Sequence, residues 1–460
     1  MGEKSFNLIP KEVTPVNTRY RRIKTKIPVP ESIEILEKLQ KFEPHSMSGQ
    51  PPVIWNSASG VNVYDKWGNI WLDFSSGVLV TNTGHCAQEI KEAIIKQAEK
   101  GLIHNYCFPS EIRANLAEKL ISITPPELDK VFFLTTGSEV TENAIKLART
   151  YGQKRFGKEK ICIVSFDKAF HGRTLGAQMI GGIPALKEWI VNLDKDMVQV
   201  PFPDGFRTKD TSFGLFLKSL EELNIEPSRI AGIILETYQG GSASFAPKEY
   251  IQQLSKWCKE NNALLIFDEI QAAFGRTGTM FGFEHYDVIP DLMCCGKGIT
   301  SSLPLSAVIG RAEIMDIYAP GEMTSTHSGN PICCAVSIAN IDKILRENLD
   351  ENAKNMGNVL FEGLDKLKNK YDSVIGAVHG KGLVAGVQLV KPGGIEPDGD
   401  LAFDVVSRCV EKGLLFFAPI GFGGATVKIC PPLVITEEAI MEGLQVIDEA
   451  FEEVLSGGRE

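Results

Sequence analysis

Lys297 has the setting that most directly suggests covalent chemistry. It stands between Gly296 and Gly298, directly after the apolar run Leu292–Cys295. Glycines on both sides leave room for a bulky group, and partial desolvation would lower the pKa of the amine. A lysine in that state is nucleophilic enough to form a Schiff base with a carbonyl compound. A plain surface turn is the alternative interpretation.

Asp268 follows a second apolar run, Ala263–Phe267. A carboxylate at the end of a buried strand needs a partner, because burying an unpaired charge is costly. A cationic ring nitrogen of a bound ligand would supply that partner. The alternatives are that Asp268 pairs with an arginine or caps a turn.

Gly137 and Ser138 precede a helical pattern over residues 139–151 and follow the apolar run Val131–Leu134. The free N–H groups and the dipole at a helix start attract anions. Gly137 allows close backbone approach, and Ser138 adds a hydroxyl. The segment therefore predicts an anion site, with Ser138 as an ordinary helix cap an equally weighted alternative.

Phe170, His171 and Arg173 follow the strand pattern Ile161–Ser165. Phe170 would lie flat against an aromatic ligand, and Arg173 would bind a carboxylate. In the alternative interpretation Phe170 belongs to the core and His171 is a satisfied packing histidine. No metal is predicted at His171.

A mostly parallel sheet covered by helices on both faces would position these segments. Apolar runs alternate with amphipathic stretches from about Val131 onward, which is typical of such a sheet. Ligands in open α/β sheets bind beyond the carboxyl ends of the strands, where all four segments fall. Further predicted strands are Ile230–Leu235, Leu264–Phe267 and Ser306–Ile309.

Three regions are expected. Residues 75–345 form a large domain, and residues 346–460 form a smaller α/β domain that residues 1–74 join. In the smaller domain we predict helices near Glu351–Tyr371 and Leu401–Lys412 and strands near Leu383–Leu389 and Leu414–Phe417.

The composition and charge of the chain argue against nucleic acid and membranes as partners. The 460 residues carry 48 Lys and Arg against 58 Asp and Glu, so the net charge of -10 argues against nucleic acid. We expect the basic stretch Arg19–Lys26 to be an ordinary solvated or subunit-contacting segment. No apolar run approaches the roughly 18 residues of a membrane span.

The cysteines and the first residues favour a reduced, cytoplasmic setting. Ten cysteines include no pair or Cys/His cluster with zinc spacing, so no metal site is predicted. The start, Met1–Lys4, does not read as a signal or transit peptide, and Gly2 lacks the pattern for N-terminal acylation. The residues around Lys297 do not match the P-loop motif, and the glycines near residue 421 do not have the spacing of a dinucleotide-binding motif.

Pyridoxal phosphate requires together what the four segments supply separately: an anion cradle, a carboxylate under a ring nitrogen, a stacked aromatic side chain and a Schiff-base lysine. The segments also resemble the class III, or omega, aminotransferases. The similarity runs from about Gly60 to Ile440. Motifs that carry it are Thr136–Glu139, Phe170–Thr174, Phe267–Gln271, Gly296–Gly298 and Ser325–Pro331.

The resemblance implies an α/β protein of fold type I, with a large domain around a mostly parallel central sheet and a smaller α/β domain. It implies that Lys297 forms the Schiff base and moves the substrate proton, and that Asp268 keeps the ring nitrogen protonated. Thr326 would reach the phosphate from the other subunit of a homodimer, and assembly into a tetramer is left open. The implied cofactor contacts are Gly137, Ser138, Phe170, His171, Glu236, Asp268, Ile270, Gln271, Lys297 and Thr326.

Substrate contacts implied by the resemblance are Val78, Arg173, Gly241 and Lys428. Related 4-aminobutyrate and ornithine-type enzymes carry a glutamate at the position of Gly241 and an arginine at that of Lys428. Lysine lacks the planar fork that binds a carboxylate through two bonds, so α-carboxylate recognition would be weaker or different. The alternative is that Lys428 merely keeps a charge there.

The expected activity is ping-pong transfer of an amino group from an omega-amino acid or related amine, 4-aminobutyrate-like, to a 2-oxo acid such as 2-oxoglutarate or pyruvate. A racemase or epimerase on the same fold is the alternative, because some relatives use the same lysine to return the proton. A non-catalytic protein that only binds the cofactor is a third, less favoured reading.

Overall fold

The computed structural model describes residues 5–457, which divide into two compact units. One unit contains the chain up to Ala87, residues 241–243 and the chain from Glu351; the other contains residues 88–240 and 244–350. The sequence placed domain boundaries after residues 74 and 345 instead. Met1–Lys4, on which the prediction about targeting and acylation depends, lie outside the described residues.

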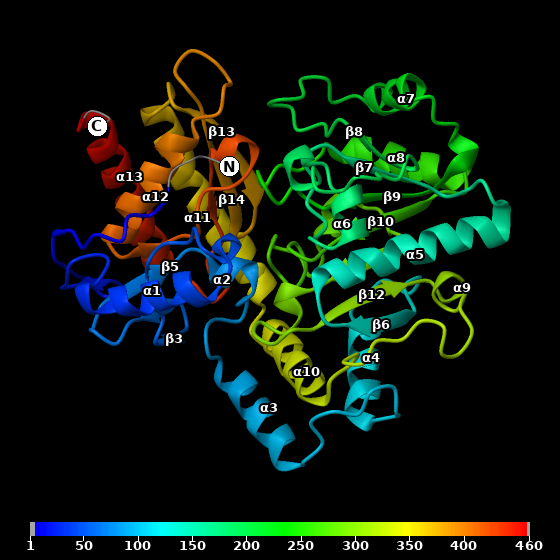
Figure 1. The fold of residues 1–460 in the computed structure, drawn as a ribbon, viewed down its shortest axis with the longest axis horizontal. Helices are drawn as coiled ribbons and strands as arrows, with labels where there is room; N and C mark the ends of the chain where they lie inside the picture. The colour runs from blue at the N-terminus through cyan, green and yellow to red at the C-terminus, as the bar shows by residue number, and fades with distance from the viewer. Residues whose placement is uncertain (1–4, 458–460) are drawn as a thin grey trace. The chain divides into compact units, whose positions relative to one another are not determined.

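The unit of residues 88–240 and 244–350 is built on a seven-stranded sheet in the order β6-β12-β11-β10-β9-β7-β8 (Figure 1). Strand β12 runs antiparallel to both of its neighbours, and the other pairs are parallel. The bounds are β6 Lys130–Leu134, β7 Cys162–Phe166, β8 Met197–Val200, β9 Ile230–Glu236, β10 Leu264–Asp268, β11 Leu292–Cys295 and β12 Ser306–Gly310.

Helices cover both faces of this sheet. Figure 1 shows α5 (Gly137–Phe156) on one side of strands β7–β10, with α7 (Phe213–Glu222) and α8 (Lys248–Glu260) on the other. On α5, Val140, Ala144, Leu147 and Ala148 are fully buried, as their helical spacing requires of one apolar face. The remaining helices of this unit are α3 Gln88–Glu99, α4 Glu111–Ser122, α6 Leu175–Ile180, α9 Ala312–Met315 and α10 Pro331–Arg346.

The predicted strands of this sheet are confirmed to within a residue at each end, because buried parallel strands read as continuous apolar runs. The sequence missed β8, which has only four residues and lies between Asp196 and Pro201. Three of its four residues are only half-buried, so the run carries little apolar signal.

The other unit contains two smaller sheets. A six-stranded sheet has the order β1-β2-β5-β4-β3, with β15 pairing on β5, and a three-stranded sheet has the order β13-β14-β16. The predicted helices and strands of this region are found, although β15 is only two residues long. Strand bounds are β1 Val16–Asn17, β2 Arg22–Ile23, β3 Ser57–Ser59, β4 Asn62–Tyr64, β5 Ile70–Asp73, β13 Ile375–Lys381, β14 Val384–Leu389, β15 Leu414–Leu415 and β16 Thr426–Ile429. Helix bounds are α1 Ile33–Phe42, α2 Ser76–Leu79, α11 Leu349–Lys370, α12 Gly399–Glu411 and α13 Glu437–Ser456.

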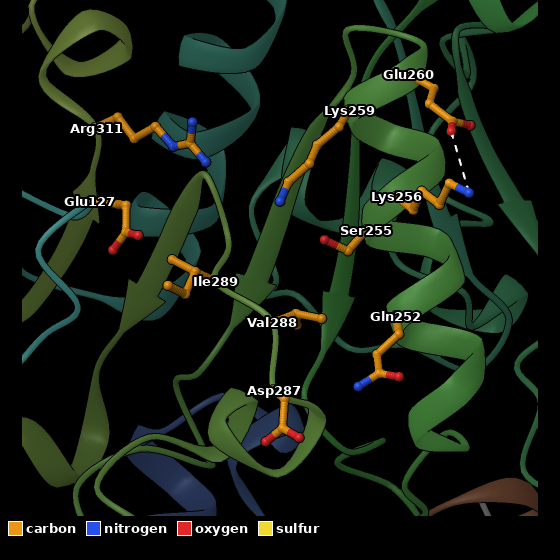
Figure 2. Close-up of a pocket in the computed structure, with 10 residues that line it drawn as sticks. All are labelled: Glu127, Gln252, Ser255, Lys256, Lys259, Glu260, Asp287, Val288, Ile289 and Arg311. Carbon is orange, nitrogen blue, oxygen red and sulfur yellow. Dashed lines mark ion pairs between the residues drawn. The ribbon is translucent and has the colours of Figure 1, made fainter.

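A groove of about 510 Å³ lies at the amino ends of β10 and β11, away from the carboxyl ends where the sequence places the site. Figure 2 shows charged side chains of both signs around it. Three cationic and three anionic residues line it, so the groove has no net charge to attract an ionic ligand. The lining is Glu127, Gln252, Ser255, Lys256, Lys259, Glu260, Asp287, Val288, Ile289 and Arg311.

Residues 5–457 lack two features. No helix there is both long and apolar enough to cross a membrane. The same residues contain no cluster of His, Cys, Asp and Glu suited to a metal ion.

Candidate active site

The carboxyl ends of five strands bring most of the predicted site residues to one edge of the seven-stranded sheet. Strand β9 ends at Glu236 and β10 at Asp268, which are register partners in the parallel pair. Lys297 follows β11, and the segment Phe170–Arg173 follows β7. The start of α5 follows β6. Parallel strands therefore place these five loops on the same side of the sheet.

Asp268 pairs with His171. Nδ1 of His171 lies 2.8 Å from Oδ2 of Asp268, and the Ile270 N–H donates to Oδ1 at 3.1 Å. Burial lowers the pKa of His171, but the hydrogen bond and the charge of Asp268 outweigh it and, with the charge of Glu236, raise that pKa. Asp268 thus caps a turn, as one alternative held, and its ionic partner is a histidine rather than an arginine.

Lys297 lies in a turn that leaves its amine desolvated. Its backbone is left-handed, with φ of 43°, and it begins a 3-10 helix over Lys297–Ile299. Burial lowers the pKa of the Lys297 amine, and the charges of Asp268 and Glu236 oppose that shift. Lys297 is half-buried and its neighbours Gly296 and Gly298 are buried, so the turn is not a plain surface turn.

Glu236 organises the end of β9. Its carboxylate accepts the N–H of Phe170 at 3.0 Å through Oε2 and the N–H of Gly240 at 3.0 Å through Oε1. A Cβ at Gly240 would lie 2.4 Å from Nε2 of Gln271, so glycine is what lets Gln271 approach. The predicted contacts Glu236 and Gln271 therefore lie beside the Phe170 loop and Gly240.

The start of α5 leaves two backbone donors open. Thr136, not Ser138, is the cap: its hydroxyl accepts the Glu139 N–H at 3.3 Å, and Glu139 accepts the Thr136 N–H at 2.7 Å. Within residues 5–457 the N–H groups of Gly137 and Ser138 have no acceptor. Ser138 instead accepts the Arg173 N–H at 3.0 Å, which joins the two predicted loops.

Phe170 is half-buried rather than part of the core, and Arg173 is exposed, with its guanidinium 5.7 Å from the centroid of the Phe170 ring. Ile270 packs against two glycines. A Cβ at Gly137 would lie 3.1 Å from Cδ1 of Ile270, and one at Gly296 would lie 3.2 Å from its Cγ2. That Phe170 and Ile270 bound a flat ring stays a prediction from the resemblance.

Three predicted substrate residues belong to the other unit. Val78 is 46% exposed in a left-handed turn. Gly241 packs so tightly that its Cβ would lie 3.1 Å from Cα of Gly421. Lys428 lies in β16, buried and opposite Gly386 of β14. Thr326, in the same unit as Lys297, is exposed.

These residues suit a phosphorylated, ring-shaped aldehyde. Two free N–H groups at the start of α5 would hold a phosphate, and Asp268 would face a protonated ring nitrogen. Nε2 of His171 is buried and has no hydrogen-bond partner among the described residues. The side of the site that contains Asp268 therefore has one buried polar atom that a ligand could bind. Glycine at positions 137 and 296 lets the Ile270 side chain pack closely against both turns. The site and the sheet together define a lysine-dependent pyridoxal phosphate enzyme.

Comparison with known proteins narrows that class. The class III aminotransferase family matches residues 45–451. A 4-aminobutyrate aminotransferase of Mycobacterium leprae is 33% identical over 93% of this chain and 97% of its own length. An alanine/serine racemase of Pyrococcus horikoshii is 31% identical over 98% of this chain and 97% of its own. A transaminase structure from the marine bacterium Virgibacillus has a TM-score of 0.84 at 30% identity, over 92% of this chain and 99% of its own.

The chain belongs to the class III aminotransferase family and is a transaminase that depends on pyridoxal phosphate.

Sequence reasoning missed two buried side chains next to the lysine turn, Ser337 and Asn340 of α10. The helix itself was not predicted, because its apolar residues show no single face. Polar residues three apart within the otherwise apolar stretch Pro331–Ile341 were the available signal.

Proposed function

We propose that this enzyme moves an amino group from an omega-amino acid or related amine, 4-aminobutyrate-like, to a 2-oxo acid such as 2-oxoglutarate or pyruvate. The observation that carries the proposal is the position of Lys297 at the same edge of the sheet as two buried carboxylates, Asp268 and Glu236. The relative from Mycobacterium leprae that bears the name 4-aminobutyrate aminotransferase supports the donor class.

The roles of the chain's residues follow from their positions. Bound pyridoxal phosphate acts as an electron sink for the carbon that bears the amino group. Lys297 would take the proton from that carbon and deliver it to the cofactor carbon that carried the aldehyde oxygen. Asp268, held by His171, keeps the ring nitrogen protonated, and Gln271 binds the ring hydroxyl. Gly137 and Ser138 hold the phosphate.

We assign substrate binding to Val78, Arg173, Gly241 and Lys428. Arg173 is exposed and stands over the ring of Phe170, which supports a carboxylate contact at the mouth of the site. Lys428 offers a single point charge rather than a fork, so it would bind a carboxylate less selectively. Gly241 has no side chain, so only its backbone could contact the substrate.

We propose a homodimer in which Thr326 completes the partner's phosphate site, and leave a tetramer open. Thr326 belongs to a segment that packs on residues 102–108: Tyr106 donates to Thr324 at 3.1 Å, and Asn330 donates to the Ile103 carbonyl at 2.8 Å. The neighbouring Phe108 is 72% exposed. Large exposed apolar side chains beside a predicted functional residue favour a subunit interface.

We propose a reducing, cytoplasmic location. All ten cysteines are free thiols, and eight of them are buried. Neither nucleic acid nor a membrane is proposed as a partner, since the chain carries a net charge of -10.

Racemisation is the second candidate, favoured by the 31% identity to an alanine/serine racemase. One experiment separates the two activities. Single amino compounds are added to the holoenzyme without an acceptor, and both the cofactor spectrum and the optical activity of the substrate are followed. Conversion of the cofactor to its amine form with release of a carbonyl product supports transfer. Loss of optical activity without that product supports racemisation, and no spectral change contradicts both.

A further inference from the structure

Helix α10 carries two polar side chains with no exposure at all, Ser337 and Asn340. Asparagine is a poor helix former, and a buried amide without partners costs several kcal/mol at worst. Residues three apart lie on the same face of a helix, so both side chains point to one neighbour.

That neighbour is the turn that follows Lys297. Nδ2 of Asn340 donates to the carbonyl of Gly298 at 2.8 Å and to that of Ile299 at 3.1 Å. Oγ of Ser337 donates to the same Ile299 carbonyl at 2.9 Å.

These contacts complete the hydrogen bonding of the lysine turn. The carbonyls of Gly296 and Lys297 accept backbone N–H groups from Ile299, at 3.0 Å, and Thr300, at 3.4 Å. The next two carbonyls end a 3-10 helix and would have no helical donor. Because α10 supplies those donors, four successive carbonyls around Lys297 are satisfied.

Lys297 itself needs such support. A non-glycine residue at φ of 43° is held in a sparsely populated conformation that persists only when its surroundings fix it. Helix α10 is itself anchored, since its cap Asn330 accepts the Ile332 N–H at 3.0 Å and Ser328 donates to the Phe133 carbonyl at 2.6 Å. It is therefore a fixed platform for the turn.

We propose that Ser337 and Asn340 are positioning residues for Lys297: by binding the Gly298 and Ile299 carbonyls they hold its backbone in the left-handed conformation that aims the amine into the site. The proposal rests on the transaminase function only for the chemical role of the Lys297 amine. The positional effect itself is a property of the apo-protein.

Three variants test it. Asn340→Leu keeps the approximate shape but removes both bonds, and Ser337→Ala removes one. Ile344→Val truncates a buried residue one turn further along α10 and serves as the control for loss of stability alone. The melting temperature of each variant is measured first. A change in the reactivity of Lys297 can then be compared with the loss of stability in the same variant.

The first readout is the reactivity of the Lys297 amine in the apo-protein, measured by competitive acylation across pH and mass spectrometry. We expect a changed pH midpoint for Lys297 in Asn340→Leu, a smaller change in Ser337→Ala and none in Ile344→Val. The second readout is kcat of the holoenzyme, expected to fall about 10- to 100-fold in Asn340→Leu, because small misplacements of a reacting group have effects of that size.

Wild-type reactivity of Lys297 in Asn340→Leu and Ser337→Ala, or changes equal to those of Ile344→Val, would overturn the proposal. Should Asn340→Leu not fold, Ser337→Ala decides the matter alone. A wild-type protein that performs no transfer would contradict the proposed function instead, and the acylation measurement would still judge the positioning role.

Discussion

At the scale of single residues, the site depends on charges that are buried and paired. Asp268 has His171 and a backbone N–H, and Lys297 lies in the field of two carboxylates. The sequence could indicate which side chains stand at strand ends, because the apolar runs are local. It could not indicate the pairing of Asp268 with His171, since 97 residues separate them.

Arg173 is the residue-scale test of the substrate class. We expect Arg173→Ala to raise KM for a carboxylate-bearing donor by about 10- to 100-fold, which corresponds to one lost charged contact. Arg173→Lys, which keeps a point charge, should give an intermediate KM. Steady-state kinetics with a donor amine that lacks a carboxylate is the control, and its KM should not change. A wild-type KM for the carboxylate-bearing donor in Arg173→Ala would remove the residue from the site.

Glu269 gives a prediction about pH and stability. Burial raises the pKa of its carboxyl to about 7, although Thr237 and the N–H groups of Gly282 and Phe283 bind it and lower the value. A carboxyl with a folded pKa above its unfolded value favours folding most below the unfolded pKa of 4.5, and that contribution is lost as pH rises to about 7. The loss is on the order of 3 kcal/mol.

Glu269→Gln should therefore flatten the dependence of the unfolding free energy on pH between about 4.5 and 7. Denaturant unfolding at several pH values measures that dependence. Glu118→Gln, at an exposed position, is the control and should leave the slope unchanged. An unaltered slope in Glu269→Gln would mean that this carboxyl keeps an ordinary pKa in the fold.

At the scale of elements, the helices and strands predicted correctly are those that a local sequence pattern is enough to identify. Buried parallel strands appear as apolar runs, and α5 shows an apolar face with helical spacing. Helix α10 was missed because its first turns, from Ile332 to Ile341, are apolar on several sides, and β8 because it is short. The cap of α5 was assigned to Ser138 as an alternative, whereas Thr136 with Glu139 forms the reciprocal pair.

That cap gives an element-scale prediction. Thr136→Ala should reduce the unfolding free energy by about 1 kcal/mol and also raise Kd for pyridoxal phosphate, because the N–H groups of Gly137 and Ser138 fray with the helix start. Thr436→Ala removes the corresponding cap of α13, where the side chain accepts the Ala439 N–H at 3.4 Å. It should cost similar stability, and calorimetric titration should find its Kd unchanged. Equal Kd in both variants would separate the cap from the anion site.

At the scale of the whole molecule, the proposed dimer makes each site a product of two chains. Lys297 and Thr326 come from different subunits in that arrangement, which a single chain's sequence indicates only through resemblance. A cyclic dimer uses the same patch on both copies, so the exposed side chains Ile103 and Phe108 would each be covered. Phe108→Asp should accordingly yield monomers in sedimentation, whereas Val191→Asp, at a 92% exposed position elsewhere, should not.

Complementation tests whether the two residues act across the interface. Lys297→Ala and Thr326→Ala are each expected to be nearly inactive as homodimers. When the two are unfolded, mixed and refolded together, random assembly makes half of the dimers mixed, and each mixed dimer has one site with both native residues. About a quarter of wild-type activity should therefore return. If Thr326 served its own chain's site, no mixed site would contain both native residues, and the mixture would stay as inactive as its parents.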